Sequence, residues 1–412
     1  MRRALVIGGS LGGLLAAHLL RSTGWDVTVL ERNAEDLTGR GAGLSTHPEL
    51  IEVLQRVGID FDETMGVGLG SVICLDREGR VYLAEDTART MSSWGRLYRS
   101  LRDPLPAGSY RLGMALTRVE QDADSVTAIF ANGQRVTGDL LVGADGGRST
   151  VREQFMPTLA PEYAGYVAWR AMLDEHEVPP AIHAEIFERY TFCLPEGELC
   201  LAYAVPGRNN ETQPGRRAYN IVWYRPTDPE HALPDLCTDA TGKCHGTTIA
   251  PPLIRPEVTA GLRAAARTLL APQLADIVAL TAQPFFQPIF DLASPQIAFG
   301  RVALLGDAAF VARPHVGAGV TKAAIDAAAL ADALVDTDVA ADLLRYQRTQ
   351  QPFGSGLVGL GRKEGAYLTA QLKPAAARSR DERERTAREV VDAHNARSES
   401  LRGVLVAARQ QA

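Results

Sequence analysis

The sequence predicts an α/β fold that carries an inserted antiparallel or mixed β-sheet domain and ends in a helical C-terminal tail. Three observations predict it. Short apolar runs ended by glycine alternate with helical patterns over residues 1–68 and return near residue 300. Strand candidates rich in aromatic and β-branched residues fill residues 160–297, and apolar residues recur at helical spacing from 381 to 411.

The first strand and helix flank a glycine-rich turn. Residues 4–7 form a short β-branched run ended by glycine, which is typical of a buried parallel strand, and a helix is expected to begin near Gly12. Gly8 can form the tight turn, and Gly13 allows the helix to pack close to the strand. Ser10 takes the usual place of the middle glycine, and its small hydroxyl still lets a phosphate approach the helix N-terminus.

Glu31 ends a second strand candidate at residues 27–30. It lies about 20 residues beyond the turn, where an acid accepts a hydrogen bond from a ribose hydroxyl. Strand, turn, helix, strand and acid together favour a dinucleotide site. A purely structural turn is the alternative.

The following elements lead to a second motif. They are predicted as a helix at 48–57, a hairpin at 71–84 that turns at 77–79, a helix at 94–105, hairpin strands over 112–138 that turn at Asn132-Gly133, and a strand at 139–142. An Asp-Gly-x-x-Ser-x-Val-Arg string then begins at Asp145. Asp145 could be a simple N-cap, but the string is much longer than a cap needs.

The inserted sheet and a third motif follow. Strand candidates lie at 166–173, 184–194, 199–207 and 219–225, a surface loop at 226–256, a helix at 258–280, a buried strand at 302–305 and a helix at 320–334. Asp307 could accept from a ribitol hydroxyl, while Gly317, Ala318 and Gly319 would let backbone amides approach a flavin ring. A plain loop is the alternative for this stretch.

The three motifs, in this order, resemble those of the FAD-dependent aromatic hydroxylases of the para-hydroxybenzoate hydroxylase type, over residues 3–350. Shorter stretches at 163–170, 205–208 and 313–315 are similar to the 2,6-dihydroxypyridine hydroxylase branch. The resemblance implies a Rossmann-like FAD-binding domain with an inserted substrate domain. The expected boundaries are 1–68, 98–158 and 298–355 for the FAD-binding domain, 69–97 and 159–297 for the substrate domain, and 356–412 for the helical C-terminal region.

The resemblance also implies which residues contact FAD. Residues 10–13 would hold the pyrophosphate, Glu31 the adenosine ribose, Arg40 the phosphate or adenine side, and residues 317–321 the isoalloxazine. The full expected set is Gly8, Ser10, Leu11, Gly12, Gly13, Glu31, Arg32, Arg40, Arg99, Asp145, Asp307, Gly317, Ala318, Gly319, Val320 and Thr321.

The chain departs from the family pattern at three positions. Phe310 stands where the family has histidine, and Thr321 stands where it often has asparagine, so hydrogen bonding to the flavin edge is expected to differ. Trp94 replaces a common arginine. Arg96 and Arg99 lie on the same predicted helix and could substitute for it.

The family's activity implies a monooxygenase in which NADH or NADPH reduces FAD and O2 forms a C4a-hydroperoxide that attacks an electron-rich ring. The expected substrate is a small hydroxylated aromatic or N-heteroaromatic ring of the hydroxypyridine kind. His315 is the candidate catalytic base or orienting group, because a histidine pKa of about 6.5 suits proton exchange at neutral pH. A backbone hydrogen bond is its alternative role.

Phe192, Tyr203 and Trp223 lie on the predicted substrate sheet and, with His315, are the candidate substrate-binding residues. Core packing is the alternative for each of these aromatic side chains. The sequence has no second glycine-rich fingerprint, so NAD(P)H is expected to visit a groove without a domain of its own. Two other functions stay open: an FAD-dependent dehydrogenase or oxidase, and a non-catalytic flavin-binding redox sensor.

Composition limits the partners. With 412 residues, 46% hydrophobic and 22% charged, the chain is expected to be a soluble globular protein, and its net charge of −6 argues against nucleic-acid or membrane partners. The five scattered cysteines lack metal-ligand spacing, so free thiols are expected and no metal site is predicted. A strand that starts at residue 4 leaves no room for a signal peptide, which predicts a cytoplasmic protein. The apolar C-terminal stripe is expected to pack on its own chain or to form a homodimer contact.

Overall fold

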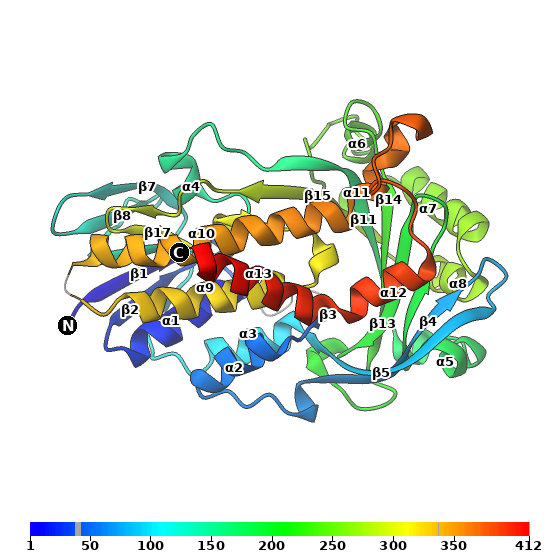
Figure 1. Cartoon of the computed structure of the whole chain (residues 1–412), viewed down its shortest axis with the longest axis horizontal. Coiled ribbons are helices and arrows are strands. Elements are labelled where there is room, and N and C mark those ends of the chain that lie inside the picture. The colour runs from blue at the N-terminus through cyan, green and yellow to red at the C-terminus, as the bar shows by residue number, and fades with distance from the viewer. Residues whose placement is uncertain (38–42, 337, 412) are drawn as a thin grey trace.

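The computed structural model describes residues 1–37, 43–336 and 338–411. It has the predicted α/β architecture, with a six-stranded sheet at one end of the long axis and a nine-stranded sheet at the other (Figure 1). Long C-terminal helices run along the molecule between the two ends (Figure 1). Among the described residues, no helix is both long enough and apolar enough to cross a membrane.

The six-stranded sheet has five parallel strands and one antiparallel edge strand. Its order is β16 (Ala298–Phe299), β17 (Val302–Leu304), β10 (Leu140–Gly143), β1 (Arg3–Ile7), β2 (Asp26–Leu30) and β6 (Tyr110–Arg111), with β16 the antiparallel edge. Helices α1 (Leu11–Ser22) and α9 (Gly319–Ala333) contact each other on one face. Because both faces of a parallel sheet are covered, its central strands are apolar at almost every position.

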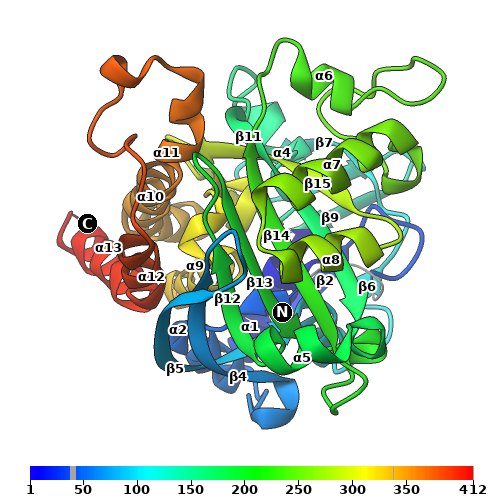
Figure 2. The ribbon, with the colours of Figure 1, turned by 90° about the vertical axis from the view of Figure 1, so that its right-hand side faces the viewer.

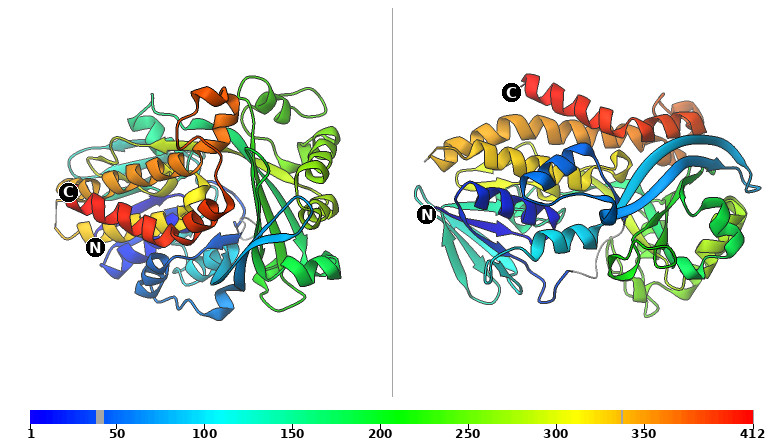
Figure 3. Two further views of the ribbon diagram at one scale, coloured as in Figure 1. Left: turned by 45° about the vertical axis from the view of Figure 1, so that its right-hand side comes forward. Right: turned by 90° about the horizontal axis from the view of Figure 1, so that it is seen from below.

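A three-stranded antiparallel sheet lies on the side of the parallel sheet away from α9 (Figure 3). It consists of β7 (Leu116–Gln121), β8 (Val126–Phe130) and β9 (Arg135–Gly138). The turn from β8 to β9 contains Asn132 and Gly133, as predicted, and Gly133 has φ +80°.

The nine-stranded sheet is largely antiparallel and draws strands from most of the chain. Its order is β18 (Phe310–Val311), β15 (Phe285–Ala293), β11 (Glu162–Asp174), β14 (Ala218–Pro226), β13 (Leu199–Val205), β12 (Arg189–Cys193), β4 (Gly66–Leu75), β5 (Val81–Ser93) and β3 (Gly43–Ser45). Its two outermost strands, β3 and β18, lie within sequence ranges predicted for the FAD-binding domain. The domain boundaries themselves stay a prediction.

The remaining helices are α2 (Pro48–Arg56), α3 (Trp94–Arg102), α4 (Thr150–Phe155), α5 (Pro180–Ile186), α6 (Ala232–Leu236), α7 (Pro256–Leu269) and α8 (Pro272–Leu280). Among them, α5, α7 and α8 lie on the outer face of the nine-stranded sheet (Figure 2), whereas α2 contacts α9, α3 contacts α1 and α4 contacts β7. Two predicted elements were wrong in detail. The helix expected at 258–280 is two helices, because Pro272 lacks an amide hydrogen and disfavours helix at the residue before it. The strand expected at 184–194 is α5 followed by β12.

The C-terminal tail is helical and packs on its own chain. It comprises α10 (Val339–Glu364), α11 (Ala366–Thr369), α12 (Ala387–Asn395) and α13 (Arg397–Gln411). Leu401 and Ala408 of α13 are buried in a cluster with Phe353 and Leu357 of α10 and with Val316. Intramolecular packing therefore accounts for the apolar stripe of the tail.

A buried ion pair joins the two ends of the β11–β14 connection. Arg217 donates from Nη2 to Glu175 Oε1 at 2.6 Å and from Nε to Oε2 at 2.9 Å, and the two side chains are only 7% and 4% exposed. Burial alone would raise the pKa of Glu175, but hydrogen bonds from Arg217 and His183 outweigh it and lower this pKa to about 2.

This pair predicts an acid-sensitive stability. The pKa of Glu175 is lower in the folded chain, about 2, than its ordinary value of 4.5, so the carboxylate's contribution is complete above pH 4.5. It is lost progressively as the pH falls from 4.5 toward 2. Denaturant titrations of wild type and Glu175→Gln across this range should show a free-energy difference that shrinks as the pH falls; a constant difference would contradict the prediction.

Candidate active site

The β1–α1 turn has room only for glycine at its two ends. Gly8 has φ +106°, and a Cβ built on it would lie 2.4 Å from the carbonyl oxygen of Ala144. A Cβ on Gly13 would lie 2.0 Å from the carbonyl oxygen of Gly8. Both neighbours are backbone atoms, so they could make room for a side chain only if the main chain moved. The absence of side chains at Gly8 and Gly13 lets α1 start in direct contact with the end of β1.

The N-terminus of α1 offers free amides to an anion. Ser10 is the N-cap residue, and its side chain makes no capping hydrogen bond. The amides of Leu11, Gly12 and Gly13 form the first turn and have no partner within the helix. A 12-residue helix that starts in this way is a suitable site for a pyrophosphate.

Glu31 lies where the sequence places it, at the end of β2. Its carboxylate is buried and accepts from the Gly9 amide at 2.8 Å and from the Asn33 amide at 3.0 Å. A cavity of about 430 Å³ opens beside it at the carboxyl ends of β1, β2 and β10, and its lining includes Gly8, Ser10, Glu31, Arg32 and Asp145. Cofactors bind at this edge of doubly wound sheets. Arg40 lies outside the described residues.

The second motif is held together by its own side chains. Asp145 accepts from Ser149 Oγ at 2.5 Å and from the Val151 amide at 3.2 Å, and burial raises its pKa. Arg152, to which no role was given from sequence, donates to the carbonyl oxygens of Gly147 at 2.7 Å and Ala308 at 3.0 Å. Arg152 therefore connects the second motif to the third. The sequence signal for this role was the arginine itself, because the other residues of the string are typical of a helix N-terminus.

The third motif contains a buried charge that was not singled out from sequence. Lys322 is fully buried, and its Nζ lies 3.4 Å from Asp307 Oδ1 and makes no hydrogen bond to the described residues. Asp326 accepts from the Gly306 amide at 2.9 Å, and burial raises the pKa of Asp326 to about 6 against the opposing charge of Lys322. Asp307 itself is 55% exposed, so its carboxylate is open to a ligand hydroxyl.

The loop before α9 ends in residues with few side-chain atoms, so its amides are accessible to a ligand. Gly317 has φ +62°, Ala318 is buried, and Gly319 starts α9 with no atom near the position a Cβ would take. Val320 and Thr321 complete the first turn of α9, and the Thr321 hydroxyl is buried without a hydrogen-bond partner among the described residues. These features fit a flavin ring edge that accepts from the amides and the hydroxyl.

Two of the departures from the family pattern have structural explanations. Phe310 is fully buried, and its ring packs so closely on Gly354 of α10 that a Cβ there would lie 2.1 Å from it. Trp94 lines the 430 Å³ cavity and stacks on Tyr98. Arg99 donates to the carbonyl oxygen of Asn209 at 2.8 Å and is not among the residues that line this cavity, and its contact with the cofactor stays a prediction.

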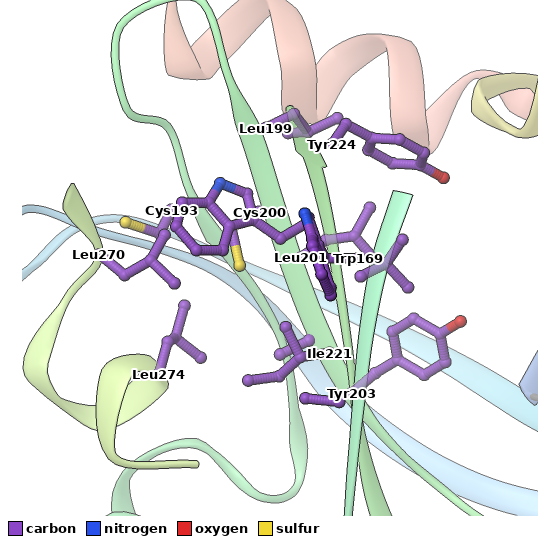
Figure 4. Packing of buried hydrophobic residues seen from close by; sticks show 14 of the residues in the cluster. Trp169, Cys193, Leu199, Cys200, Leu201, Tyr203, Ile221, Tyr224, Leu270 and Leu274 are labelled. Carbon is purple, nitrogen blue, oxygen red and sulfur yellow. The ribbon is translucent and has the colours of Figure 1, made fainter. Parts of the chain in front are cut away.

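The sheet brings two of the three predicted substrate residues together. Phe192 pairs with Leu201, and Tyr203 pairs with Asn220, so Phe192 and Tyr203 lie on the same face as Tyr190 and Tyr224. Trp223 pairs with Cys200 and therefore lies on the opposite face. Figure 4 shows Leu270 and Leu274 on the same side of the sheet as Cys200. Trp223 is 1% exposed and so occupies the outer core, away from Tyr203.

His315 faces the inner side of the sheet from the loop before α9. Its Nε2 lies 2.8 Å from the Tyr166 hydroxyl, and its ring centroid lies 4.7 Å from that of Tyr224. Burial, with the charges of Arg397, Arg313 and Arg385, lowers the pKa of His315 to about 3. The ring is therefore neutral at pH 7. The role of a base at neutral pH, expected from sequence, relied on a pKa of about 6.5, and the lowered pKa does not support it.

Comparisons with known proteins agree with this geometry. The NAD(P)-binding Rossmann-like domain family matches residues 6–54, and the FAD binding domain-like family matches residues 163–291. The chain is 30% identical over 368 residues to 2,6-dihydroxypyridine 3-monooxygenase of Paenarthrobacter nicotinovorans, covering 89% of this chain and 91% of the relative. The chain belongs to the FAD-dependent aromatic monooxygenases.

A further relative and a solved structure support the family assignment. FAD-dependent urate hydroxylase of Klebsiella pneumoniae is 30% identical over 362 residues, covering 84% of this chain and 85% of that protein. The solved structure of 2,6-dihydroxypyridine-3-hydroxylase from Arthrobacter nicotinovorans superposes with a TM-score of 0.83 at 29% identity, covering 89% and 93%. This FAD-dependent monooxygenase thus uses FAD as its cofactor and NAD(P)H as its co-substrate.

Proposed function

We propose that this monooxygenase hydroxylates a small hydroxylated nitrogen heterocycle of the hydroxypyridine class. The observation that carries the proposal is the meeting of aromatic side chains from the inner sheet face with His315 of the loop before α9. The two relatives named above act on a dihydroxypyridine and on urate, both oxygen-substituted nitrogen heterocycles. Planar aromatic walls with a few polar groups suit such a ring.

Each motif has a proposed task toward FAD. The free amides at the start of α1 bind the pyrophosphate, Glu31 binds the adenosine ribose, and Asp307 binds the ribitol chain. The first turn of α9 holds the edge of the flavin ring. Bound FAD, once reduced by NAD(P)H, supplies the electrons for activation of O2. Lys322 places a buried positive charge beside Asp307 and so favours negative charge nearby.

The residues of the substrate side position the ring and exclude water. Tyr203, Tyr224 and Phe192 are each at most 5% exposed, so the inner face of the sheet is dry. His315 is neutral and hydrogen-bonded to Tyr166, and we propose that it orients a ring hydroxyl rather than removing its proton.

The test of the function is a stoichiometry measurement. Hydroxypyridines, hydroxybenzoates and urate are screened for stimulation of NADH and NADPH oxidation, and the product is analysed by mass spectrometry under labelled O2. A hydroxypyridine that gains one labelled oxygen atom supports the proposal. A dehydrogenase or oxidase would consume NAD(P)H or O2 without inserting oxygen into the organic product, and that result would overturn it.

Replacing His315 with alanine should leave FAD bound but slow hydroxylation. Loss of one hydrogen bond that orients the ring is expected to lower kcat by on the order of 100-fold. Because the pKa of His315 is about 3, the pH profile of the wild type should lack an inflection near 6.5 that depends on this residue. An inflection there that disappears in His315→Asn would show that His315 titrates, and Tyr166→Phe serves as the control for its hydrogen bond.

We also propose a cytoplasmic location. All five cysteines, at 74, 193, 200, 237 and 244, are free thiols, and free thiols persist in reducing compartments. A homodimer contact stays an open proposal, and the oligomeric state in solution tests it, for instance by light scattering.

A further inference from the structure

The C-terminal tail reaches the loop that precedes α9. Arg397 is the first residue of α13, and its guanidinium packs against Gly317, where a Cβ would lie 3.1 Å from Nη1. The same side chain lines a pocket with His315, Phe192, Tyr367 and His394. One wall of this pocket thus belongs to the inner sheet face, and the opposite wall belongs to α11, α12 and α13.

This pocket carries one uncompensated positive charge. Arg385 lines it too, but Arg385 is paired with Glu364 at 2.6 Å. Arg397 forms no ion pair with any residue that the structure describes, although it is partly buried. His315 and His394 add no charge, because burial and the nearby arginines lower the pKa of both rings.

Polar atoms without partners surround the same space. The Tyr367 hydroxyl and both ring nitrogens of His394 are buried and make no hydrogen bond within the described part of the chain. Tyr367 and His394 are 4% and 3% exposed, so bulk water does not satisfy them. Buried polar groups are nearly always hydrogen-bonded, so these atoms can donate to or accept from a ligand or a bound water in the pocket.

The shape and chemistry of the pocket select an anionic group. A guanidinium is always charged, and its planar fork of donors matches two oxygens of a carboxylate. The cavity holds about 40 Å³, which is room for two or three water molecules and therefore for an anionic substituent rather than for a whole ring. The ring would then lie on the side of the Gly317 loop.

We propose that Arg397 binds the anionic oxygen of the substrate ring, either a ring carboxylate or an ionised ring hydroxyl, and that the C-terminal helices thereby complete the substrate site. Arg397 is a substrate-binding residue in this proposal, and Tyr367 and His394 add hydrogen bonds to the same anion. The inference rests on the proposed hydroxylase function and specifies which charge on the substrate the enzyme recognises.

Binding to the purified holoenzyme tests the proposal. 6-Hydroxynicotinate, its neutral amide 6-hydroxynicotinamide, and 2,6-dihydroxypyridine are titrated by isothermal calorimetry and by the change in flavin absorbance. Arg397→Gln should weaken binding of the anionic rings about tenfold or more, as expected for a lost charge-assisted hydrogen bond, and should leave the amide unchanged. Arg397→Lys should recover part of the affinity. Arg409→Gln, which removes one exposed charge from the same helix, should behave as wild type.

The outcomes separate the two proposals. Weakened binding confined to 6-hydroxynicotinate assigns a ring carboxylate, and weakened binding confined to ionised 2,6-dihydroxypyridine assigns a ring oxyanion. If the wild type binds these anions and Arg397→Gln binds them equally well, the inference is overturned while the hydroxylase function stands. If the wild type binds none of the probes, the proposed substrate class and the inference both fail. If Arg397→Gln does not retain FAD, binding of the anionic rings is compared between the wild type and Arg397→Lys only.

Discussion

Replacing Gly13 with alanine is expected to abolish FAD binding. The added Cβ would lie 2.0 Å from the carbonyl oxygen of Gly8, so the start of α1 would have to move away from the end of β1. That movement would displace the free amides at the N-terminus of α1 and would distort the β1–α1 loop that lines the cavity. We expect affinity for FAD to fall by at least about 100-fold, on the order of 3 kcal/mol.

The bound flavin is measured by its absorbance after purification and by titration of the apoprotein with FAD. Gly359→Ala is the matched control, because Gly359 also lies inside a helix, α10, but has no atom near the position of a Cβ. That control should keep FAD and gain up to about 1 kcal/mol of stability from helix propensity. Circular dichroism shows whether the Gly13 variant is folded. A folded variant that binds FAD as the wild type does would contradict the prediction.

Replacing Arg217 with alanine is expected to destabilise the fold by about 3 kcal/mol or more. The substitution leaves the carboxylate of Glu175 buried at 4% exposure without its bidentate partner, and an uncompensated buried charge is costly. Some compensation remains, because His183 and the Gly215 amide still hydrogen-bond to Glu175. The loss should be largest near neutral pH, where Glu175 is ionised in both the folded and the unfolded chain.

Arg208→Ala provides the control for this second substitution. Arg208 pairs with Asp174, the neighbour of Glu175, at 3.1 Å, but its side chain is 84% exposed. A surface pair of this kind contributes at most about 1 kcal/mol. Chemical denaturation of both variants at pH 7 compares them. If Arg217→Ala loses no more stability than Arg208→Ala, the prediction is wrong, because burial of the Glu175–Arg217 pair then does not increase the stability lost on its removal.

The sequence predicted features whose signals are local. The alternation of β1, α1 and β2 was readable because Gly8, Gly13 and Glu31 mark its turns within about 30 residues of one another. The hairpin turn at Asn132 and Gly133 was readable for the same reason, since it needs positive φ. Three motifs in a fixed order were enough to indicate the family before any contact between them was known.

Features set by distant partners could not be predicted. Trp223 faces the outer core because its pairing with Cys200 fixes the register, and periodicity alone does not say which face of a strand meets the cofactor. The low pKa of His315 arises from burial by several elements, including arginines of the C-terminal tail. The partner of Arg152 at Ala308 lies 156 residues away, and nothing in the local pattern identifies it.

The strand order of the six-stranded sheet also determines when the enzyme can acquire its cofactor. β1 pairs with β10, and β10 pairs with β17, so the sheet beneath the glycine turn is complete only when Val302–Leu304 has joined it. During synthesis β1 can pair with β2 and then with β10, but β10 gains its second neighbour, β17, only after about 160 further residues, at roughly 5–20 residues per second. We therefore expect capture of FAD to follow translation of most of the chain, because Asp307 and the first turn of α9, which belong to the proposed cofactor site, lie beyond β17 in the sequence.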